Sequence, residues 1–169
     1  DYFIYHRNNA DEGMRFAKPR LGRIAKQYIV NFSRRFNAPD GRFAGVVSAP
    51  IAVSYFAELL KQYQLPPDST LILRDKDNGL VTRTPALPDR PDGQVGDAGG
   101  SPEFLKLIES GVKSATYQLS NSPDGANQML SFQRLDNAPM IAIVGISGNH
   151  YLAGWRAAVY KTAALVAGF

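Results

Sequence analysis

Residues 70–84, TLILRDKDNGLVTRT, carry a complete β-hairpin signal, around which the rest of the fold can be predicted. Two short runs rich in apolar and β-branched residues, 70–74 and 80–84, flank the turn sequence Asp75-Lys76-Asp77-Asn78-Gly79. Asn-Gly is a specific turn dipeptide, since both residues tolerate the positive φ of a tight hairpin turn. The pattern therefore predicts two antiparallel strands joined by this turn.

The chain that follows the hairpin predicts the rest of one sheet. Residues 85–100 are rich in proline and glycine, which is typical of a loop. Ser101-Pro102 then opens a short helix, with serine as N-cap and proline at the first helical position, and Gly111 ends it. Strand candidates follow at residues 113–120, 126–135 and 140–147. The short connections predict an α+β domain with a central antiparallel sheet and helices on one face.

The chain before the hairpin predicts a smaller set of elements. Residues 14–21 favour a strand, and Pro19 within it indicates an edge. Residues 27–36 alternate as a strand does, and a turn at residues 38–41 joins them to a valine-rich strand at 42–51. The pair Arg34-Arg35 fits a charged strand edge that discourages aggregation. A helix is predicted at residues 53–63, and Pro66-Pro67 marks the boundary.

Composition excludes several kinds of site. The 169 residues contain no cysteine, so disulfides, thiolate metal sites and cysteine nucleophiles are ruled out. The two histidines, His6 and His150, lack metal-ligand spacing, and we expect neither a metal nor a cofactor. The net charge of +4 comes without a basic run, which argues against nucleic-acid binding. No nucleophile elbow or phosphate-binding loop is present, so we do not expect an enzyme.

The last residues allow two interpretations. From Tyr151 onward the sequence becomes steadily more apolar, and residues 162–169 carry no charge, although a membrane span needs about 20 residues. This stretch fits the first turns of a transmembrane helix, with Trp155, Tyr160 and Lys161 near the membrane interface. It equally fits an amphipathic helix packed on the domain.

The order of several short motifs resembles that of double Cache sensors, a PAS-like family. The motifs, in chain order, are Asp1-Tyr2-Phe3, His6-Arg7, Ser33-Arg34-Arg35, residues 39–47, Tyr55-Phe56, Asp77-Asn78-Gly79, Arg83-Thr84-Pro85, Ser122-Pro123-Asp124-Gly125, residues 131–135, Val144-Gly145 and residues 152–156. The resemblance covers nearly the whole chain, and it is nearest to the branch attached to membrane-bound diguanylate cyclases and histidine kinases. It departs from a complete double Cache sensor, because the long first helix and first strands of the distal module are missing.

The resemblance implies an organisation and a location. Residues 1–65 would be part of a membrane-distal Cache module, residues 66–148 a membrane-proximal module, and residues 149–169 a helix leading to a transmembrane segment. The chain would lie at the periplasmic face of a bacterial inner membrane, as a homodimer. It would sense a ligand and control a diguanylate cyclase, which makes cyclic di-GMP, or a kinase. The alternative is a periplasmic dimerisation or protein-docking module without a small-molecule ligand.

Two groups of residues are candidates for a ligand site in such a sensor. In the distal part these are Tyr2, His6, Arg15 and Tyr28, where the arginine would hold the carboxylate of an amino-acid-like ligand. The competing interpretation is that Tyr28 packs in the core and Arg15 is solvated. In the proximal part, a smaller pocket could be lined by Tyr117, Gln128, Ser131 and Arg134, and the preferred interpretation gives them a purely structural role.

Overall fold

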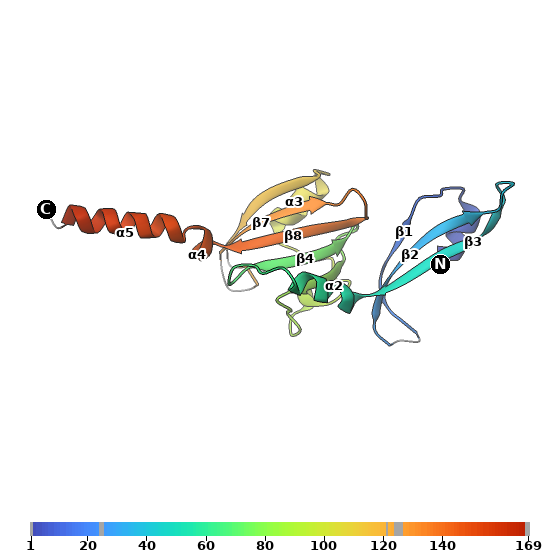
Figure 1. Cartoon of the computed structure of the whole chain (residues 1–169), viewed down its shortest axis with the longest axis horizontal. Coiled ribbons are helices and arrows are strands. Elements are labelled where there is room, and N and C mark those ends of the chain that lie inside the picture. Colours follow the sequence, from blue (N-terminus) through green and yellow to red (C-terminus); the bar gives the residue numbers. More distant parts are fainter. Residues whose placement is uncertain (1, 24–25, 121, 124–126, 168–169) are drawn as a thin grey trace.

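The described residues of the computed structural model, 2–23, 26–120, 122–123 and 127–167, form two antiparallel sheets (Figure 1). The first sheet has the strand order β1-β2-β3 and the second β5-β4-β8-β7-β6. The strands are β1 (Arg15–Leu21), β2 (Tyr28–Asn37), β3 (Phe43–Ala52), β4 (Thr70–Asp75), β5 (Leu80–Thr84), β6 (Ser114–Leu119), β7 (Gln128–Arg134) and β8 (Met140–Ser147). The helices are α1 (Tyr2–Asn8), α2 (Val53–Lys61), a 3₁₀ turn η1 (Pro91–Gly93), α3 (Pro102–Glu109), α4 (Gly148–Tyr151) and α5 (Ala153–Ala167). The predicted α+β class with a central antiparallel sheet is confirmed.

The hairpin at residues 70–84 forms as predicted. The Asp75 N–H donates to the Gly79 carbonyl at 2.8 Å, and Asn78 has a φ of 73°, the positive value that an Asn-Gly turn requires. The register shifts between Leu73 and Arg74, so that β5 carries one extra residue. Such a bulge re-aims side chains, and here it brings the side chains of Leu80 and Arg83 to the same face of the sheet.

The helix α3 covers one face of the five-stranded sheet. Its predicted N-cap is confirmed, since the Phe104 N–H donates to Ser101 Oγ at 3.2 Å. Gly111 follows the helix with a φ of 76°, as expected for a residue that ends a helix. Phe104 is buried in a core cluster with Leu130, Phe132, Ile141 and Ile143 of the sheet.

The three-stranded sheet carries a helix that the sequence did not predict. Helix α1 lies on this sheet, and Arg35 of β2 donates through Nη1 to the carbonyls of His6 and Asn9 at its end. Arg34 donates through Nε to the Glu12 carbonyl at 2.8 Å. The prediction that Arg34-Arg35 protect a strand edge is therefore wrong, because β2 is the central strand and the pair instead anchors α1 and the segment after it.

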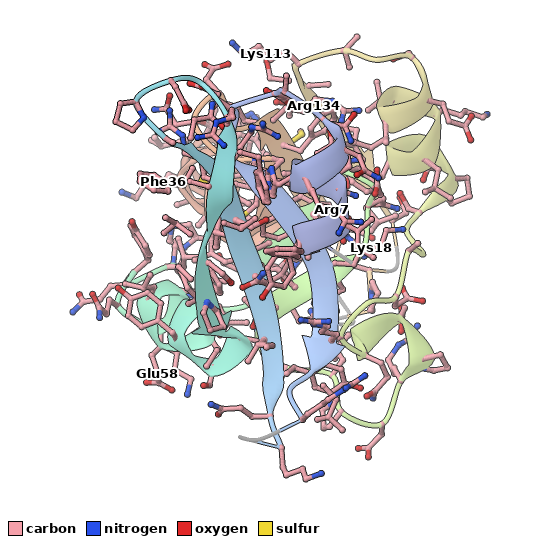
Figure 2. The ribbon with its side chains drawn as sticks, turned by 90° about the vertical axis from the view of Figure 1, so that its right-hand side faces the viewer. Arg7, Lys18, Phe36, Glu58, Lys113 and Arg134 are labelled. Carbon is pink, nitrogen blue, oxygen red and sulfur yellow. The ribbon has the colours of Figure 1, made fainter. Side chains whose placement is uncertain are left out.

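The two sheets share one core cluster. Helix α2 follows β3 without a linker, and its first residue, Val53, is buried together with side chains of both sheets: Phe16, Val30, Leu73, Val81 and Met140. An exposed ion pair, from Lys18 Nζ to Asp77 Oδ2 at 3.7 Å, also joins β1 to the β4–β5 turn. Figure 2, which faces the three-stranded sheet, shows Lys18 toward one margin and Phe36 projecting outward on the other side.

The C-terminal helix does not pack on the sheet. Strand β8 passes into α4, whose Asn149 N–H is capped by Ser147 Oγ at 3.2 Å, and α5 then extends away from the molecule (Figure 1). All side chains from Ala153 to Val166 are exposed. The interpretation of a helix packed on the domain is therefore wrong. The described helices include none long and apolar enough to cross a bilayer, and the transmembrane interpretation stays a prediction.

Most predicted element bounds lie within two residues of those observed. The exceptions are the missed helix α1 and the C-terminal helix, which is two helices rather than one. The predicted turn at Asp124-Gly125, the start of the strand at residue 126, Asp1 and residues 168–169 lie outside the described residues.

Candidate functional site

A cavity of about 360 Å³ lies between the five-stranded sheet, α3 and the segment that precedes α3. Seven polar or charged side chains line it: Thr70, Arg74, Arg83, Asp92, Ser101, Tyr117 and Gln128. The apolar part of the wall comes from Ile72, Leu80, Phe104, Leu119, Leu130 and Ile143. A volume of this size, apolar with a few polar groups, is typical of a small-molecule site.

Strand alternation explains how the sheet builds this wall. Thr70, Ile72 and Arg74 are alternate residues of β4 and point to the same face. Across the sheet, Thr70 pairs with Gly145, and Gly145 pairs with Leu130. A Cβ atom on Gly145 would lie 3.1 Å from Gln128 Oε1 and 3.3 Å from Leu130 Cγ, so glycine allows these two side chains to lie across it.

Arg74 is the most unusual group in the cavity. Its exposed fraction is only 5%, and its Nη1 donates to the carbonyls of Asn78 at 2.8 Å and Asp97 at 3.1 Å. Its Nε atom is buried without a hydrogen-bond partner, and no ion pair joins Arg74 to a carboxylate within the described part of the chain. Burial lowers the pKa of Arg74, and the nearby Asp97 partly opposes this. The guanidinium is thus a buried cation whose hydrogen bonds, among the described residues, go to carbonyl oxygens.

Residues 96–99, in the segment before α3, are hydrogen-bonded to Asn78 in the β4–β5 turn and to Leu80 at the start of β5. Asn78 donates through Nδ2 to the carbonyls of Ala98 at 2.7 Å and Gly99 at 3.2 Å. The Leu80 N–H donates to the Asp97 carbonyl, and the Gly96 N–H donates to the Leu80 carbonyl, both at 2.7 Å. The predicted loop is therefore an ordered wall whose position depends on the turn.

Gln128 and Tyr117 complete the site on the side of β6 and β7. Gln128 is 2% exposed and donates through Nε2 to the Asp68 carbonyl at 2.8 Å and to Thr70 Oγ1 at 3.1 Å. Burial raises the pKa of Tyr117 to about 12, and Arg74 partly opposes this. The phenol is therefore neutral at ordinary pH and able to donate a hydrogen bond.

Two of the four residues predicted to line the proximal pocket do line the cavity. Tyr117 and Gln128 line the cavity, whereas Ser131 and Arg134 do not. Ser131 is exposed on the opposite face of β7, where its Oγ accepts from Thr116 Oγ1 at 3.2 Å. Arg134 donates to the carbonyl of Ile108 at 2.9 Å, in the last turn of α3, and to that of Val112 at 3.1 Å, just beyond the helix.

The four residues predicted in the distal part do not line one cavity. Tyr2 borders an open groove in the three-stranded sheet, together with Arg20 and Arg23. His6 is fully buried, with its Nε2 3.1 Å from Ser33 Oγ, and the Arg15 guanidinium lies 3.6 Å above the ring centre of Tyr5.

Tyr28 has an exposed fraction of 45%, so the competing interpretation that it packs in the core is wrong. The ligand-binding role of Tyr2, His6, Arg15 and Tyr28 stays a prediction.

Sequence reasoning missed Arg74 and Arg83 as site residues. The available signal was an arginine within each short apolar strand of the hairpin, on strands that a sheet with helices on one face would bury. Simple alternation along the strand would put Arg83 on the face opposite to Leu80, because the register shift between Leu73 and Arg74 cannot be read from the sequence.

Neither a metal-binding group among the described residues nor a match by sequence identifies the ligand of this cavity. The described residues contain no group of three or more His, Asp or Glu side chains placed to hold a metal ion. No protein-family model matches the sequence, and no curated protein matches it.

Solved structures with a similar fold are extracellular sensor domains. The extracellular domain of the histidine kinase rpHK1S-Z16 matches 91% of this chain at 28% identity, with a TM-score of 0.71. The extracellular domain of mmHK1S-Z3 matches 92% of this chain at 16% identity, with a TM-score of 0.68. The ligand-binding domain of the Campylobacter jejuni chemoreceptor Tlp3, in complex with L-norvaline, matches 88% of this chain at 15% identity, with a TM-score of 0.56. The chain spans 61%, 56% and 53% of the length of these three structures. It has the PAS-like Cache fold of extracellular sensor domains.

Proposed function

We propose that this chain is part of the ligand-sensing, extracytoplasmic region of a bacterial membrane receptor, at the periplasmic face of the inner membrane. The observation that carries the proposal is the cavity of about 360 Å³ with the buried Arg74 in its wall. A cation buried without a paired carboxylate is costly, and a ligand that pairs with it would offset that cost.

The similar structures support this proposal. Structures of Tlp3 with L-norvaline, L-valine and isoleucine show that a domain of this fold binds small molecules with a carboxylate. The histidine-kinase domains support a kinase as the output, and a diguanylate cyclase that makes cyclic di-GMP is the other output we propose. The chain itself would act without catalysis, by changing the activity of that output domain.

The path from the cavity to the output would run through the last strand. Ile143 of β8 lines the cavity, and β8 leads directly into α4 and α5, which we propose continues toward the membrane. A ligand transmits a signal only if it binds one arrangement of these elements more tightly than another. We propose a small rotation or shift of α5 within a homodimer as the response.

A second function is favoured by a different observation. Several large apolar side chains of α5 are exposed, including Trp155 at 64%, Tyr160 at 73% and Val166 at 72%. Such a surface suits a dimerisation or protein-docking module that binds no small molecule.

A thermal-shift screen separates the two functions. Neutral, cationic and anionic small molecules are added to the chain and to the whole extracytoplasmic region of the receptor. A ligand at 100 times its Kd stabilises the folded state by about 2.7 kcal/mol, which raises Tm by roughly 5–10 °C for a domain of this size. Such a rise supports the sensor. A flat screen on both proteins, together with self-association that Trp155→Ala abolishes, supports the docking module.

The predicted distal site is tested in the same screen. We propose that Arg15 holds a ligand carboxylate there, with Tyr2, His6 and Tyr28 around it. Arg15→Gln should then remove the response to a carboxylate ligand. If Arg15→Gln retains the full response, the distal residues are not the binding site.

A further inference from the structure

We infer that the cavity beside α3 selects small monocarboxylates with an apolar body, and that Arg74 holds the carboxylate. The inference rests on the proposed sensing function and adds the ligand class and the residue that recognises it. It concerns the five-stranded sheet and does not involve Tyr2, His6, Arg15 or Tyr28.

The first argument is the unused hydrogen-bonding capacity of Arg74. A guanidinium has five N–H donors in a planar fork. The two hydrogen bonds that the structure gives it both leave from Nη1, and the buried Nε has no partner within the described ranges. The remaining donors suit the two oxygens of one carboxylate, which arginine binds through paired parallel hydrogen bonds.

The second argument is the charge of the cavity wall. Its charged side chains are Arg74, Arg83 and Asp92. Asp92 accepts two hydrogen bonds from Arg90, from Nε to Oδ1 at 2.9 Å and from Nη2 to Oδ2 at 3.1 Å. This pairing occupies both oxygens of Asp92. Asp92 is thus paired with a residue outside the wall, and the wall favours a ligand that brings a negative charge to Arg74.

The third argument is the size and polarity of the remaining wall. Ile72, Phe104, Leu130 and Ile143 form an apolar surface next to Arg74. The guanidinium carbon of Arg74 lies 5.8 Å from the ring centre of Phe104, so the charged and apolar parts of the site adjoin. At about 30 Å³ for each water-sized group, the cavity of 360 Å³ holds roughly a dozen non-hydrogen atoms. Branched aliphatic and arylacetic acids have this size.

The test compares each carboxylate with its own amide. The probes are 4-methylpentanoate and phenylacetate, and their controls are 4-methylpentanamide and phenylacetamide, which keep the shape and remove the charge. Binding to the whole chain is measured by calorimetry. The Nε–H resonance of Arg74 is followed by NMR on protein labelled with ¹⁵N-arginine, because this group has no partner before the ligand enters.

The variants are Arg74→Gln, Arg74→Lys and the control Arg134→Gln. Arg134 is a matched control, since it also lies on the five-stranded sheet and donates only to carbonyls, but outside the cavity. We expect at least one carboxylate to bind, and its amide to bind at least tenfold more weakly. Arg74→Gln should weaken carboxylate binding by roughly tenfold to a hundredfold, since hydrogen bonds to charged groups are lost. Arg74→Lys should keep part of the affinity, and Arg134→Gln all of it.

Three results would overturn the inference. The first is equal binding of acid and amide, and the second is unchanged carboxylate binding in folded Arg74→Gln. The third is an absence of binding by both acids, or binding that leaves the Arg74 Nε–H resonance in place. If Arg74→Gln fails to fold, the comparison of acid with amide on the unchanged protein still decides. Neutral or cationic ligands found in the broader screen would leave the sensor proposal intact while this inference fails.

Discussion

Replacing Phe104 with alanine should separate α3 from the five-stranded sheet. Phe104 has an exposed fraction of 2%, and its ring lies 5.6 Å from that of Phe132 in an edge-on arrangement and 6.0 Å from that of Tyr117 in a stacked one. Removing a buried phenylalanine ring typically costs about 3–5 kcal/mol of unfolding free energy. One side of this ring faces the cavity, where it has fewer atoms to contact, so we expect the lower end of that range, about 3 kcal/mol.

The assay is urea-induced unfolding followed by circular dichroism, with the free energy taken from the midpoint and slope of the transition. The matched control is Phe36→Ala, because Phe36 is 56% exposed and projects into solvent (Figure 2). That substitution should change the unfolding free energy by less than about 0.5 kcal/mol. A cost below about 1 kcal/mol for Phe104→Ala, or an equal cost for the two variants, would refute the packing that we derive for α3.

Two further predictions concern Tyr117 and Arg35. Because burial raises the pKa of Tyr117 to about 12, its contribution to stability should be complete below about pH 10 and disappear as the pH rises toward 12. An absorbance titration at alkaline pH should show a late-ionising tyrosine that is missing from Tyr117→Phe. A late ionisation that persists in this variant would assign the raised pKa to another tyrosine. Arg35→Ala should lower the hydrogen-exchange protection of α1 by roughly tenfold or more, since two charge-assisted bonds to carbonyls are lost. Arg42→Ala, whose exposed side chain pairs with Asp40, should leave α1 unchanged, and equal loss in both variants would contradict the anchoring role of Arg35.

The parts of the fold that were predicted correctly depend on local chemistry. The Asn78-Gly79 turn and the Ser101 cap are specified by neighbouring residues, and the structure confirms both. Helix α1 was missed because long-range contacts hold it, from Arg35 to the His6 carbonyl and from Ser33 to the His6 ring. A sequence pattern has no means of showing that a strand about 28 residues away supplies these partners.

The candidate site was predictable only in part for a similar reason. Tyr117 and Gln128 were predicted as lining residues and line the cavity, whereas Ser131 of the same prediction lies on the opposite face of β7. Arg83 could not be placed by alternation, since the bulge between Leu73 and Arg74 reverses the face expected for it. The importance of Arg74 depends on what surrounds it, two carbonyls and no paired carboxylate in the described structure, and that arrangement exists only in the folded chain.

The direct connection from β8 through α4 to α5 has a mechanical consequence. Ser147 closes the strand and caps α4, and the Gly148 N–H donates to the Asn127 carbonyl at 2.8 Å, so the base of the helical segment is fixed to the neighbouring part of the chain. The 15 residues of α5 form a rod about 22 Å long, which is joined to α4 by a hydrogen bond from Arg156 Nη1 to Asn149 Oδ1 at 3.0 Å and whose described side chains are exposed as far as Val166. A tilt of only about 5° at its base moves the tip of a rod of this length by about 2 Å. A change at the base of α5 that is too small to alter the sheet visibly would therefore displace the tip of the helix. That displacement would be large enough to shift the surface of α5 against the surface of another helix.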